Sequence, residues 1–233
     1  MAAREDPSRE GRPSWDSDSP WPPKLGDLRG RLNPYRGPED DPSPRPGGWL
    51  SSVAVVLRPD PSGRELELLL IRRSRSDSDP WSGHMALPGG RKDRRDPSLL
   101  STATRETLEE VGVPLARKGE PLGNLEVVQP VGAHLPLFTV LPFVFRVPAP
   151  TVARVASREV AAIRWVSLSH LQDKRNQTRF TYRRNNISLR FPAIDLAGHP
   201  IWGLTHRILT DLLHRLDADT AGDRDGQPTG SRS

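Results

Sequence analysis

Residues 87–112 read LPGGRKDRRDPSLLSTATRETLEEVG and combine a glycine pair, a charged loop and a segment with three glutamates. Adjacent glycines let the backbone turn sharply and approach a ligand closely, and amides in such loops can cradle phosphate oxygens. A helix is predicted after the loop, with Asp96 as its N-cap, Pro97 as its first residue and Gly112 as its stop. The stretch therefore predicts a ligand-binding loop that leads directly into a helix.

The three glutamates, Glu106, Glu109 and Glu110, stand at the i, i+3 and i+4 spacing of a helix. Their carboxylates then fall within about 100° of one face. Each like-charge i,i+4 pair costs roughly a few tenths of a kcal/mol, which a hard divalent cation would more than offset. Oxygen ligands favour Mg²⁺ or Mn²⁺ over zinc. A solvated acidic face steadied by Arg105 is the alternative that the spacing alone leaves open.

The joint pattern resembles the Nudix box, written G-x5-E-x7-R-E-x2-E-E-x-G and followed by an apolar residue. Here Gly90 begins the box, Asp96 stands in place of the first glutamate, and eight residues instead of seven precede Arg105. These two departures are similar to one branch of the superfamily, the coenzyme A pyrophosphatase-like Nudix proteins, which read P-G-G-x-x-D-x-x-D. The box therefore resembles that branch more than the general pattern.

Segments outside the box also look like that branch. Residues 69–74 and 83–90 resemble its upstream signature, although Ile71 replaces a Thr and Leu87 replaces a Phe. The segment Ile201-Trp202-Gly203-Leu204-Thr205 looks like the entry to its terminal helix, so the resemblance covers about residues 49–216.

The resemblance implies a hydrolase of a nucleoside diphosphate linked to another moiety, with water attacking phosphorus and Mg²⁺ or Mn²⁺ holding the diphosphate. It implies that Glu106, Glu109 and Glu110 are metal ligands and that Glu109 is also catalytic. Arg105 is expected to orient the glutamates, and Glu159 resembles the downstream glutamate that often joins the metal site. The residues expected to contact the substrate are Gly89, Gly90, Arg72 and Arg73.

Three parts are predicted along the chain. Residues 1–47 are a proline-rich leader expected to be disordered, with a short helix near residues 25–32 that could dock on the body. Residues 48–216 are expected to form the Nudix hydrolase domain. Residues 217–233 are expected to be a disordered polar tail.

Apolar patterning predicts an α+β fold, namely an α/β/α sandwich. Strands surrounding one central helix and followed by a terminal helix at 201–216 favour this class. The resemblance implies the Nudix version of it, a mixed β-sheet with a catalytic loop-helix-loop and a C-terminal helix. The predicted strands are residues 49–58, 65–73, 122–128, 138–147 and 162–166, and a hairpin pairs 179–183 with 187–191.

Composition excludes several classes of protein. The 233 residues include no Cys, which excludes a disulfide framework and Cys-based zinc sites. No apolar run approaches the roughly 20 residues of a membrane span, and the first residues lack the apolar stretch of a signal peptide. We therefore expect a cytoplasmic protein, monomeric or homodimeric, without a membrane partner.

Two other functions are compatible with the sequence. One is a Nudix-fold module that senses a nucleotide without cleaving it, although such modules usually lose glutamates that this chain keeps. The other is nucleic-acid or cap binding through the basic body, since the net charge is +5. The aromatic residues, 6% of the chain, show no interleaved stacking motif, so the expected partner is a small nucleotide diphosphate and not a nucleic acid. ADP-ribose, NADH and nucleotide sugars are the alternative substrates.

Overall fold

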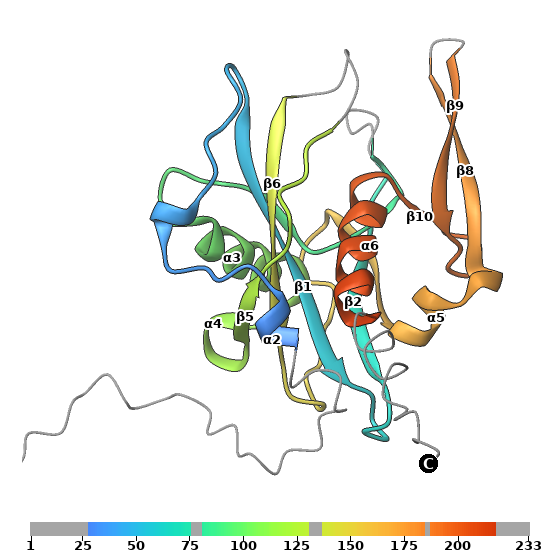
Figure 1. Cartoon of the computed structure of the whole chain (residues 1–233), viewed down its shortest axis with the longest axis horizontal. Coiled ribbons are helices and arrows are strands. Elements are labelled where there is room, and N and C mark those ends of the chain that lie inside the picture. The colour runs from blue at the N-terminus through green and yellow to red at the C-terminus, as the bar shows by residue number, and fades with distance from the viewer. Residues whose placement is uncertain (1–27, 76–80, 131–136, 185–186, 218–233) are drawn as a thin grey trace, which may run out of the picture.

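The computed structural model describes residues 28–75, 81–130, 137–184 and 187–217 (Figure 1). The predicted tail therefore lies almost entirely outside the described residues, as do residues 1–27. In chain order the elements are α2 (Leu28–Arg31), η2 (Pro38–Asp40), β1 (Trp49–Pro59), β2 (Leu66–Arg73), β3 (Met85–Ala86), β4 (Gly89–Arg91), α3 (Leu99–Val111), α4 (Leu115–Lys118), β5 (Glu120–Asn124), β6 (Phe138–Arg146), β7 (Val160–Ser167), α5 (Leu168–Gln172), η3 (Lys174–Asn176), β8 (Gln177–Arg184), β9 (Ile187–Ile194), β10 (Ile201–Trp202) and α6 (Gly203–Asp217).

A seven-stranded mixed sheet forms the centre of the fold. Its strand order is β3-β2-β1-β6-β5, with β4 paired to β1 and β7 paired to β2. The long central pair β1 and β6 is parallel, whereas the other pairs are antiparallel. The mixed sheet that the sequence predicts is therefore confirmed.

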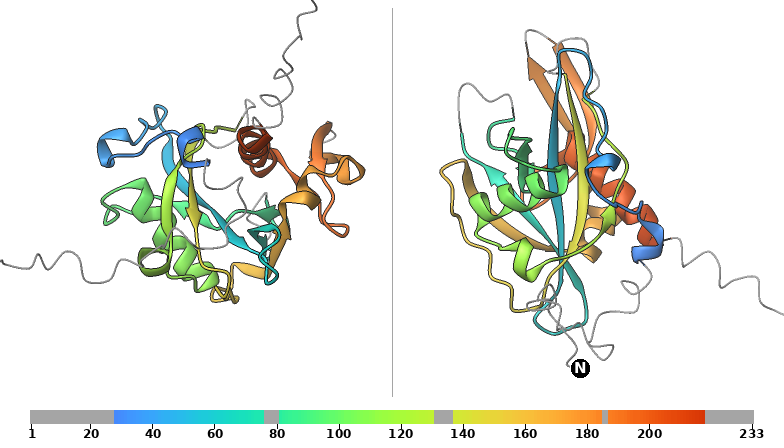
Figure 2. Two further views of the ribbon diagram at one scale, coloured as in Figure 1. Left: turned by 60° about the horizontal axis from the view of Figure 1, so that its bottom comes forward. Right: turned by 90° about the vertical axis from the view of Figure 1, so that its left-hand side faces the viewer.

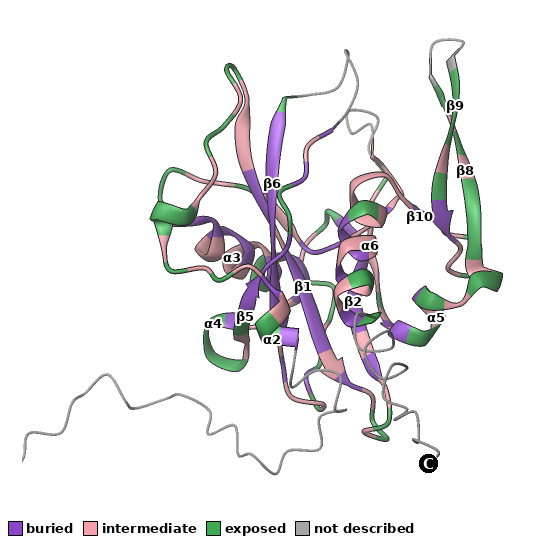
Figure 3. Cartoon of the chain, viewed as in Figure 1, coloured by how far each residue is buried: buried purple, intermediate pink, exposed green. Residues whose placement is uncertain are grey.

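Helices cover both faces of this sheet because its central strands are apolar on both sides. In β1, Ala54 and Val56 face the cluster around α3, whereas Val55 and Leu57 face the cluster that includes α6 and α2. Period-two alternation of the side chains produces this division. Figure 2 shows α3 and α6 on opposite sides of the sheet, and Figure 3 shows the buried middle of β1 and β6. The predicted α/β/α arrangement of the α+β class is confirmed.

A second sheet, β10-β9-β8, stands beside the main body (Figure 1). The long hairpin of β8 and β9 pairs Phe180 with Phe191 and Tyr182 with Leu189. Directly opposite residues share a face of an antiparallel pair, so these four apolar side chains lie on the same face. The short β10 then connects the hairpin to α6, which places the hairpin next to the start of that helix.

Residues 28–47 differ from the disordered leader that their prolines suggest. Leu28 is fully buried and Leu32 is 6% exposed, and both belong to the cluster that contains α6. Arg31 Nη1 donates a hydrogen bond to the Arg215 carbonyl, and Arg215 Nη1 donates to the Arg31 carbonyl in return. Prolines prevent long regular elements but not packing of irregular chain, so this part of the leader is a strap across the body.

Several element boundaries also differ from the prediction. The N-cap of α3 is Ser98, whose side chain accepts from the Ser101 amide, and not Asp96. The strand expected at 122–128 is β5, Glu120–Asn124. The terminal helix begins at Gly203, because residues 201–202 pair with β9 as a strand. Among the described residues, no helix combines the length and hydrophobicity needed to cross a bilayer.

Candidate active site

The glycine pair, Gly89 and Gly90, allows the backbone of β4 to lie close to both β1 and α3. Gly89 has φ 150°, and a Cβ there would lie 2.3 Å from the Ser52 carbonyl oxygen. A Cβ on Gly90 would lie 2.5 Å from the Glu106 carboxylate. Only glycine fits both positions without displacing its neighbours. The two residues therefore bring bare backbone against the glutamates of α3.

The three glutamates of α3 differ in how deeply their side chains are buried. Glu110 is 4% exposed and accepts a 2.9 Å hydrogen bond from the Gly89 amide. Burial raises the pKa of Glu110 to about 7 and also raises the pKa of Glu106, because burial disfavours the charged form. The side chain of Glu109 is 56% exposed. A uniformly solvated acidic face, the alternative open from sequence, is therefore wrong for Glu110.

Arg105 joins these glutamates to the loop before the helix. Its Nη1 donates to Glu106 Oε1 at 2.9 Å and to Glu109 Oε2 at 3.1 Å. Its Nε and Nη2 donate to the two carboxylate oxygens of Asp96 at 3.0 and 2.8 Å. The hydrogen bonds from Arg105 hold the pKa of Asp96 at about 2. Asp96 therefore anchors Arg105, and Arg105 orients two glutamates as the resemblance implies.

Glu159 reaches the same site from a separate segment. The amides of Arg154 and Ala156 donate to the last carbonyls of α3, those of Val111 and Glu110, each at 3.0 Å. The Ser74 amide donates to the Glu159 carbonyl at 2.7 Å, which ties this segment to the end of β2. The Glu159 charge also contributes to the raised pKa of Glu110. These contacts place Glu159 near the glutamates of α3.

The two predicted arginines of β2 have different surroundings. Arg73 borders a cavity next to the glycine pair, and its positive charge partly offsets the raised pKa of Glu110. Arg72 does not border the cavity, and its Nη1 lies 3.1 Å from His199 Nε2. The structure therefore brings Arg73 to the site and leaves Arg72 outside the cavity.

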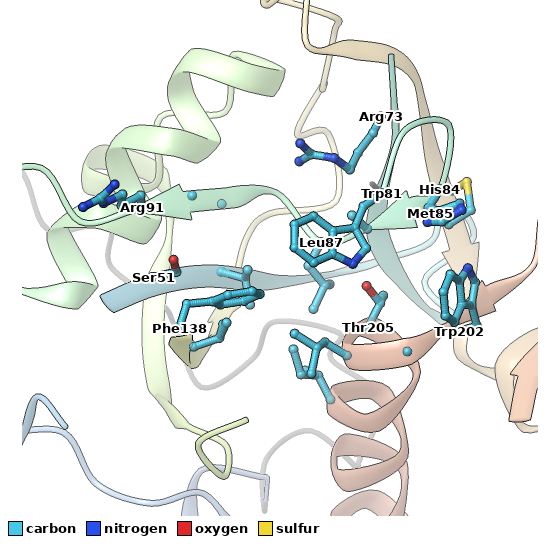
Figure 4. Close-up of a pocket in the computed structure, with 18 of the residues that line it drawn as sticks. Ser51, Arg73, Trp81, His84, Met85, Leu87, Arg91, Phe138, Trp202 and Thr205 are labelled. Atoms are coloured by element: carbon cyan, nitrogen blue, oxygen red, sulfur yellow. The ribbon is translucent and has the colours of Figure 1, made fainter. Parts of the chain in front are cut away.

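The cavity beside the glycine pair has a volume of about 280 Å³ and mainly aromatic and aliphatic walls (Figure 4). Trp49 and Phe138 stack in parallel with ring centroids 5.5 Å apart, and Trp81 meets Phe138 edge-on at 5.7 Å. Figure 4 shows Arg73, Leu87 and Thr205 reaching this space from different elements. The site therefore combines a carboxylate-rich part with an apolar part on either side of the glycine pair.

Comparison with known proteins identifies the family. The NUDIX domain family matches residues 49–185, which is more than half of the chain. The chain belongs to the Nudix superfamily. Over 164 residues it is 32% identical to an uncharacterized Nudix hydrolase, NudL of Photorhabdus laumondii, which covers 70% of this chain and 82% of that protein.

Two further comparisons extend the Nudix relationship. An uncharacterized protein of Schizosaccharomyces pombe is 42% identical over 115 residues, or 48% of this chain, and the match spans only 35% of that protein. The crystal structure of a MutT/nudix family protein from Enterococcus faecalis matches with a TM-score of 0.52 at 17% identity, over 78% of this chain and 66% of that one. The structural match shows that the two proteins share the fold.

The donor set of this Nudix chain fits a hard divalent cation. Glu106, Glu109, Glu110 and Glu159 offer only oxygen, which suits Mg²⁺ or Mn²⁺. Burial raises the pKa of Glu106 and of Glu110, and neighbouring carboxylates add to both shifts, namely Glu109 and Glu159 for Glu106 and Glu106 and Glu159 for Glu110. A bound cation would relieve this repulsion. Within the described ranges, no group of three or more acidic, His or Cys side chains is already arranged around a common point. The Arg105 guanidinium, which donates hydrogen bonds to Glu106 and Glu109, neutralises part of the negative charge of these carboxylates.

Some functional features of the Nudix site escaped the sequence reasoning. Asp96 is visible in the sequence as a box position, but only the structure shows that it anchors Arg105. The cavity walls come from Trp49, Trp81, Phe138 and Trp202, which are far apart in sequence. No local pattern marks such residues, because aromatic side chains in strands are usually core.

Proposed function

We propose that this Nudix chain is a divalent-metal-dependent pyrophosphohydrolase. It cleaves the diphosphate of CoA, acyl-CoA or a related nucleoside diphosphate conjugate by water attack at phosphorus. The observation that carries the proposal is the glycine pair set against four neighbouring carboxylates, those of Glu106, Glu109, Glu110 and Glu159. Mg²⁺ or Mn²⁺, when bound there, would neutralise phosphate charge and make the attacking water more acidic.

Other groups of the site would contact the diphosphate or keep the carboxylates in place. Gly90 carries no Cβ to cover the Glu106 carboxylate, which leaves the diphosphate a close approach to it, whereas the missing Cβ of Gly89 lets β4 pair tightly with β1. Arg73, at the edge of the cavity, supplies positive charge for a phosphate oxygen. Arg105 keeps the Glu106 and Glu109 carboxylates in place, because Asp96 fixes its guanidinium from the other side.

Proton transfer falls to a carboxylate next to the attacking water. Glu159 is the candidate general base, since its segment is bonded both to α3 and to the end of β2. Glu109 is the second candidate because its side chain is accessible to solvent and lies one helical turn from Glu106. A carboxylate within hydrogen-bond reach of the water can accept its proton directly.

The apolar cavity supports a conjugate whose second moiety is largely apolar. Trp49, Phe138 and Trp81 offer ring surface for a base or an aliphatic chain. The resemblance of residues 83–90 to the CoA pyrophosphatase-like branch points the same way. The cytoplasmic location and the monomeric or dimeric state stay predictions.

Product analysis tests the proposal. Purified protein with excess Mg²⁺ or Mn²⁺ is incubated with CoA, acyl-CoA, NADH, ADP-ribose, nucleotide sugars and nucleoside triphosphates. We expect 3′,5′-ADP and 4′-phosphopantetheine from CoA, and no products after addition of EDTA. Cleavage of a different diphosphate would keep the enzyme and discard the CoA assignment. Tight nucleotide binding without turnover of any substrate would instead identify a sensing module.

A further inference from the structure

The strap of residues 28–47 contacts the start of α3 through one carboxylate, that of Asp41. The Asp41 side chain is only 8% exposed. Its Oδ1 and Oδ2 both accept from the Leu99 amide, at 3.3 and 3.1 Å. Amides in the first turn of a helix have no intrahelical partner, and negative charge is favourable beside them. Asp41 therefore caps α3 from a distant part of the chain, next to the local cap Ser98 (Figure 1).

The same carboxylate also holds the other end of the loop that precedes α3. This loop, residues 92–98, begins directly after β4 and ends at Leu99. At its start, Lys92 Nζ donates to Asp41 Oδ2 at 2.9 Å, and the Lys92 amide donates to the Leu50 carbonyl of β1 at 2.9 Å. A loop held at both ends has fewer conformations open to it than a loop held at one end. The Asp41 side chain therefore restricts the whole loop.

The position of Asp41 is itself fixed by contacts of the strap with the sheet. The Tyr35 hydroxyl donates to Asp41 Oδ1 at 2.7 Å. The Tyr35 ring packs edge-on against Phe143 of β6, with ring centroids 4.7 Å apart. Burial and the hydrogen bond to Asp41 raise the pKa of the Tyr35 hydroxyl, so it remains a donor at neutral pH. The Asp41 carboxylate is therefore held in place relative to β6 as well as to α3.

The loop that Asp41 restricts carries Asp96, the anchor of Arg105. Asp96 accepts from Nε and Nη2 of Arg105, and Arg105 Nη1 donates to Glu106 and Glu109. A displacement of the loop would move Asp96, and with it the guanidinium that orients the two glutamates. Asp41 does not belong to the described lining of the cavity. Its influence on the glutamates therefore passes through the loop and not through contact with a substrate.

We propose that Asp41 is a positioning residue for the divalent cation and hence for catalysis. By holding both ends of the loop of residues 92–98, its carboxylate keeps Asp96 and Arg105 aligned with Glu106 and Glu109. The inference rests on the proposed function, because it assumes that these glutamates bind the cation. The strap then has a role in the active site in addition to its packing against the body.

The test compares Asp41→Asn with the wild type in Mn²⁺ binding and in turnover. Asparagine has nearly the same size and can still accept from Leu99, but it lacks the charge that holds Lys92. Residues that orient metal ligands typically contribute about 10–100-fold to metal affinity or activity. We therefore expect about tenfold weaker Mn²⁺ binding, measured by electron paramagnetic resonance of the free ion without substrate. We also expect an about tenfold lower kcat, with KM within about twofold because Asp41 does not line the cavity.

Two control variants separate positioning from stability. Asp40→Asn makes the same substitution at the neighbouring carboxylate of the strap, which is exposed and accepts from the Arg36 amide. It is expected to leave Mn²⁺ affinity and turnover unchanged. Leu171→Val removes a methylene from a fully buried residue of α5, in the cluster on the face of the sheet opposite α3. It is expected to lower the melting temperature and to leave Mn²⁺ affinity unchanged.

The binding measurement also separates this inference from the proposed function. If the wild type bound Mn²⁺ but cleaved no nucleotide, the proposed function would fail while Mn²⁺ affinity still tested Asp41. Absence of Mn²⁺ binding by the wild type would overturn both. Unchanged Mn²⁺ affinity in Asp41→Asn, or an equal loss of affinity in Leu171→Val, would show that Asp41 only stabilises the fold.

A second variant applies if Asp41→Asn does not fold. Tyr35→Phe removes the hydroxyl that donates to Asp41 and keeps the ring that packs on Phe143. Loss of this one hydrogen bond is expected to weaken Mn²⁺ binding about threefold. Unchanged Mn²⁺ binding by Tyr35→Phe would then overturn the positioning role of Asp41.

Discussion

Glu109 differs from its neighbours on α3 because its carboxylate is solvent-accessible and, among the described residues, makes a single polar contact, with Arg105. We expect Glu109→Gln to leave the fold intact and to lower kcat by several powers of ten, each worth about 1.4 kcal/mol of barrier. The amide is nearly the same size but carries no charge for a cation or a proton. Steady-state kinetics with a circular dichroism check of the fold would measure this.

The control for Glu109→Gln is Glu126→Gln. Glu126 is an exposed glutamate that contacts Arg215 far along the chain from α3. We expect it to keep wild-type turnover, since exposed ion pairs contribute little to stability. If Glu109→Gln also kept near wild-type turnover, Glu109 would not be part of the catalytic site.

Asp96 makes stability depend on acid pH. Its folded pKa of about 2 lies below the usual 3.8 because Arg105 donates to both of its oxygens. A depressed folded pKa gives stability that is fully present above about pH 4 and is lost as the pH falls through about 2. The contribution is about 2 kcal/mol of unfolding free energy, since the pKa falls from 3.8 to about 2 on folding and one pKa unit is worth 1.36 kcal/mol.

Urea unfolding at several pH values tests the Asp96 contribution. We expect Asp96→Asn to be less stable than wild type at pH 7 and to lose less stability between pH 4 and 2. The control is Asp60→Asn. The pKa of Asp60 is also lowered to about 2, but by hydrogen bonds within a turn remote from α3. Activity should fall in Asp96→Asn and not in Asp60→Asn, and equal activity in the two would show that Arg105 needs no anchor.

At the scale of elements, β4 depends on one residue that no side chain can replace. A Cβ at Gly89 would approach the Ser52 carbonyl and the Val53 backbone, neither of which can move without breaking the β1–β4 pairing. We expect Gly89→Ala to lose most activity and to lower the melting temperature strongly. Gly198→Ala is the control, because Gly198 has φ 81° and open space around it, so only a backbone cost of roughly 1–2 kcal/mol applies. Similar melting temperatures for the two variants would contradict the role of β4.

The helices and strands also show which parts of the fold follow from local sequence patterns. The glycine pair, the α3 glutamates and the strands β1, β2 and β6 follow from short-range periodicity and turn chemistry, and the structure has them close to the predicted positions. The N-cap was predicted two residues too early, because Asp96 and Ser98 are both good caps and only the fold assigns Asp96 to Arg105. The placement of Arg72 outside the cavity depends on its contact with His199, which no spacing in the sequence encodes.

At the scale of the whole molecule, the strap formed by residues 28–47 belongs to the domain. Leu28 and Leu32 fill the cluster under α6, and burial of two such side chains is worth roughly 3–6 kcal/mol. We expect a variant that begins at residue 48 to lose most of its stability in thermal unfolding. A variant that begins at residue 25 should keep both stability and activity, because it retains the strap. Equal unfolding midpoints for the two variants would show that the strap is dispensable.

The strap also marks where sequence reasoning fails at this scale. Its prolines correctly exclude long regular elements, but composition does not reveal that Tyr35 packs edge-on against Phe143 at 4.7 Å. Likewise, the cavity walls assemble from β1, β6, β10 and α6, so they exist only after long-range pairing. Motifs within one helix and loop can be read from sequence, whereas surfaces built from distant strands cannot.

The reciprocal bonds between Arg31 and Arg215 join residues 184 positions apart. At a synthesis rate of roughly 5–20 residues per second, the first of these residues would wait about 10–40 s on the ribosome for the second. During that time Leu28 and Leu32 have no α6 to pack against. The start of the strap can therefore dock fully only after α6 is made, and a nascent chain stalled before α6 emerges would present this leucine pair to chaperones.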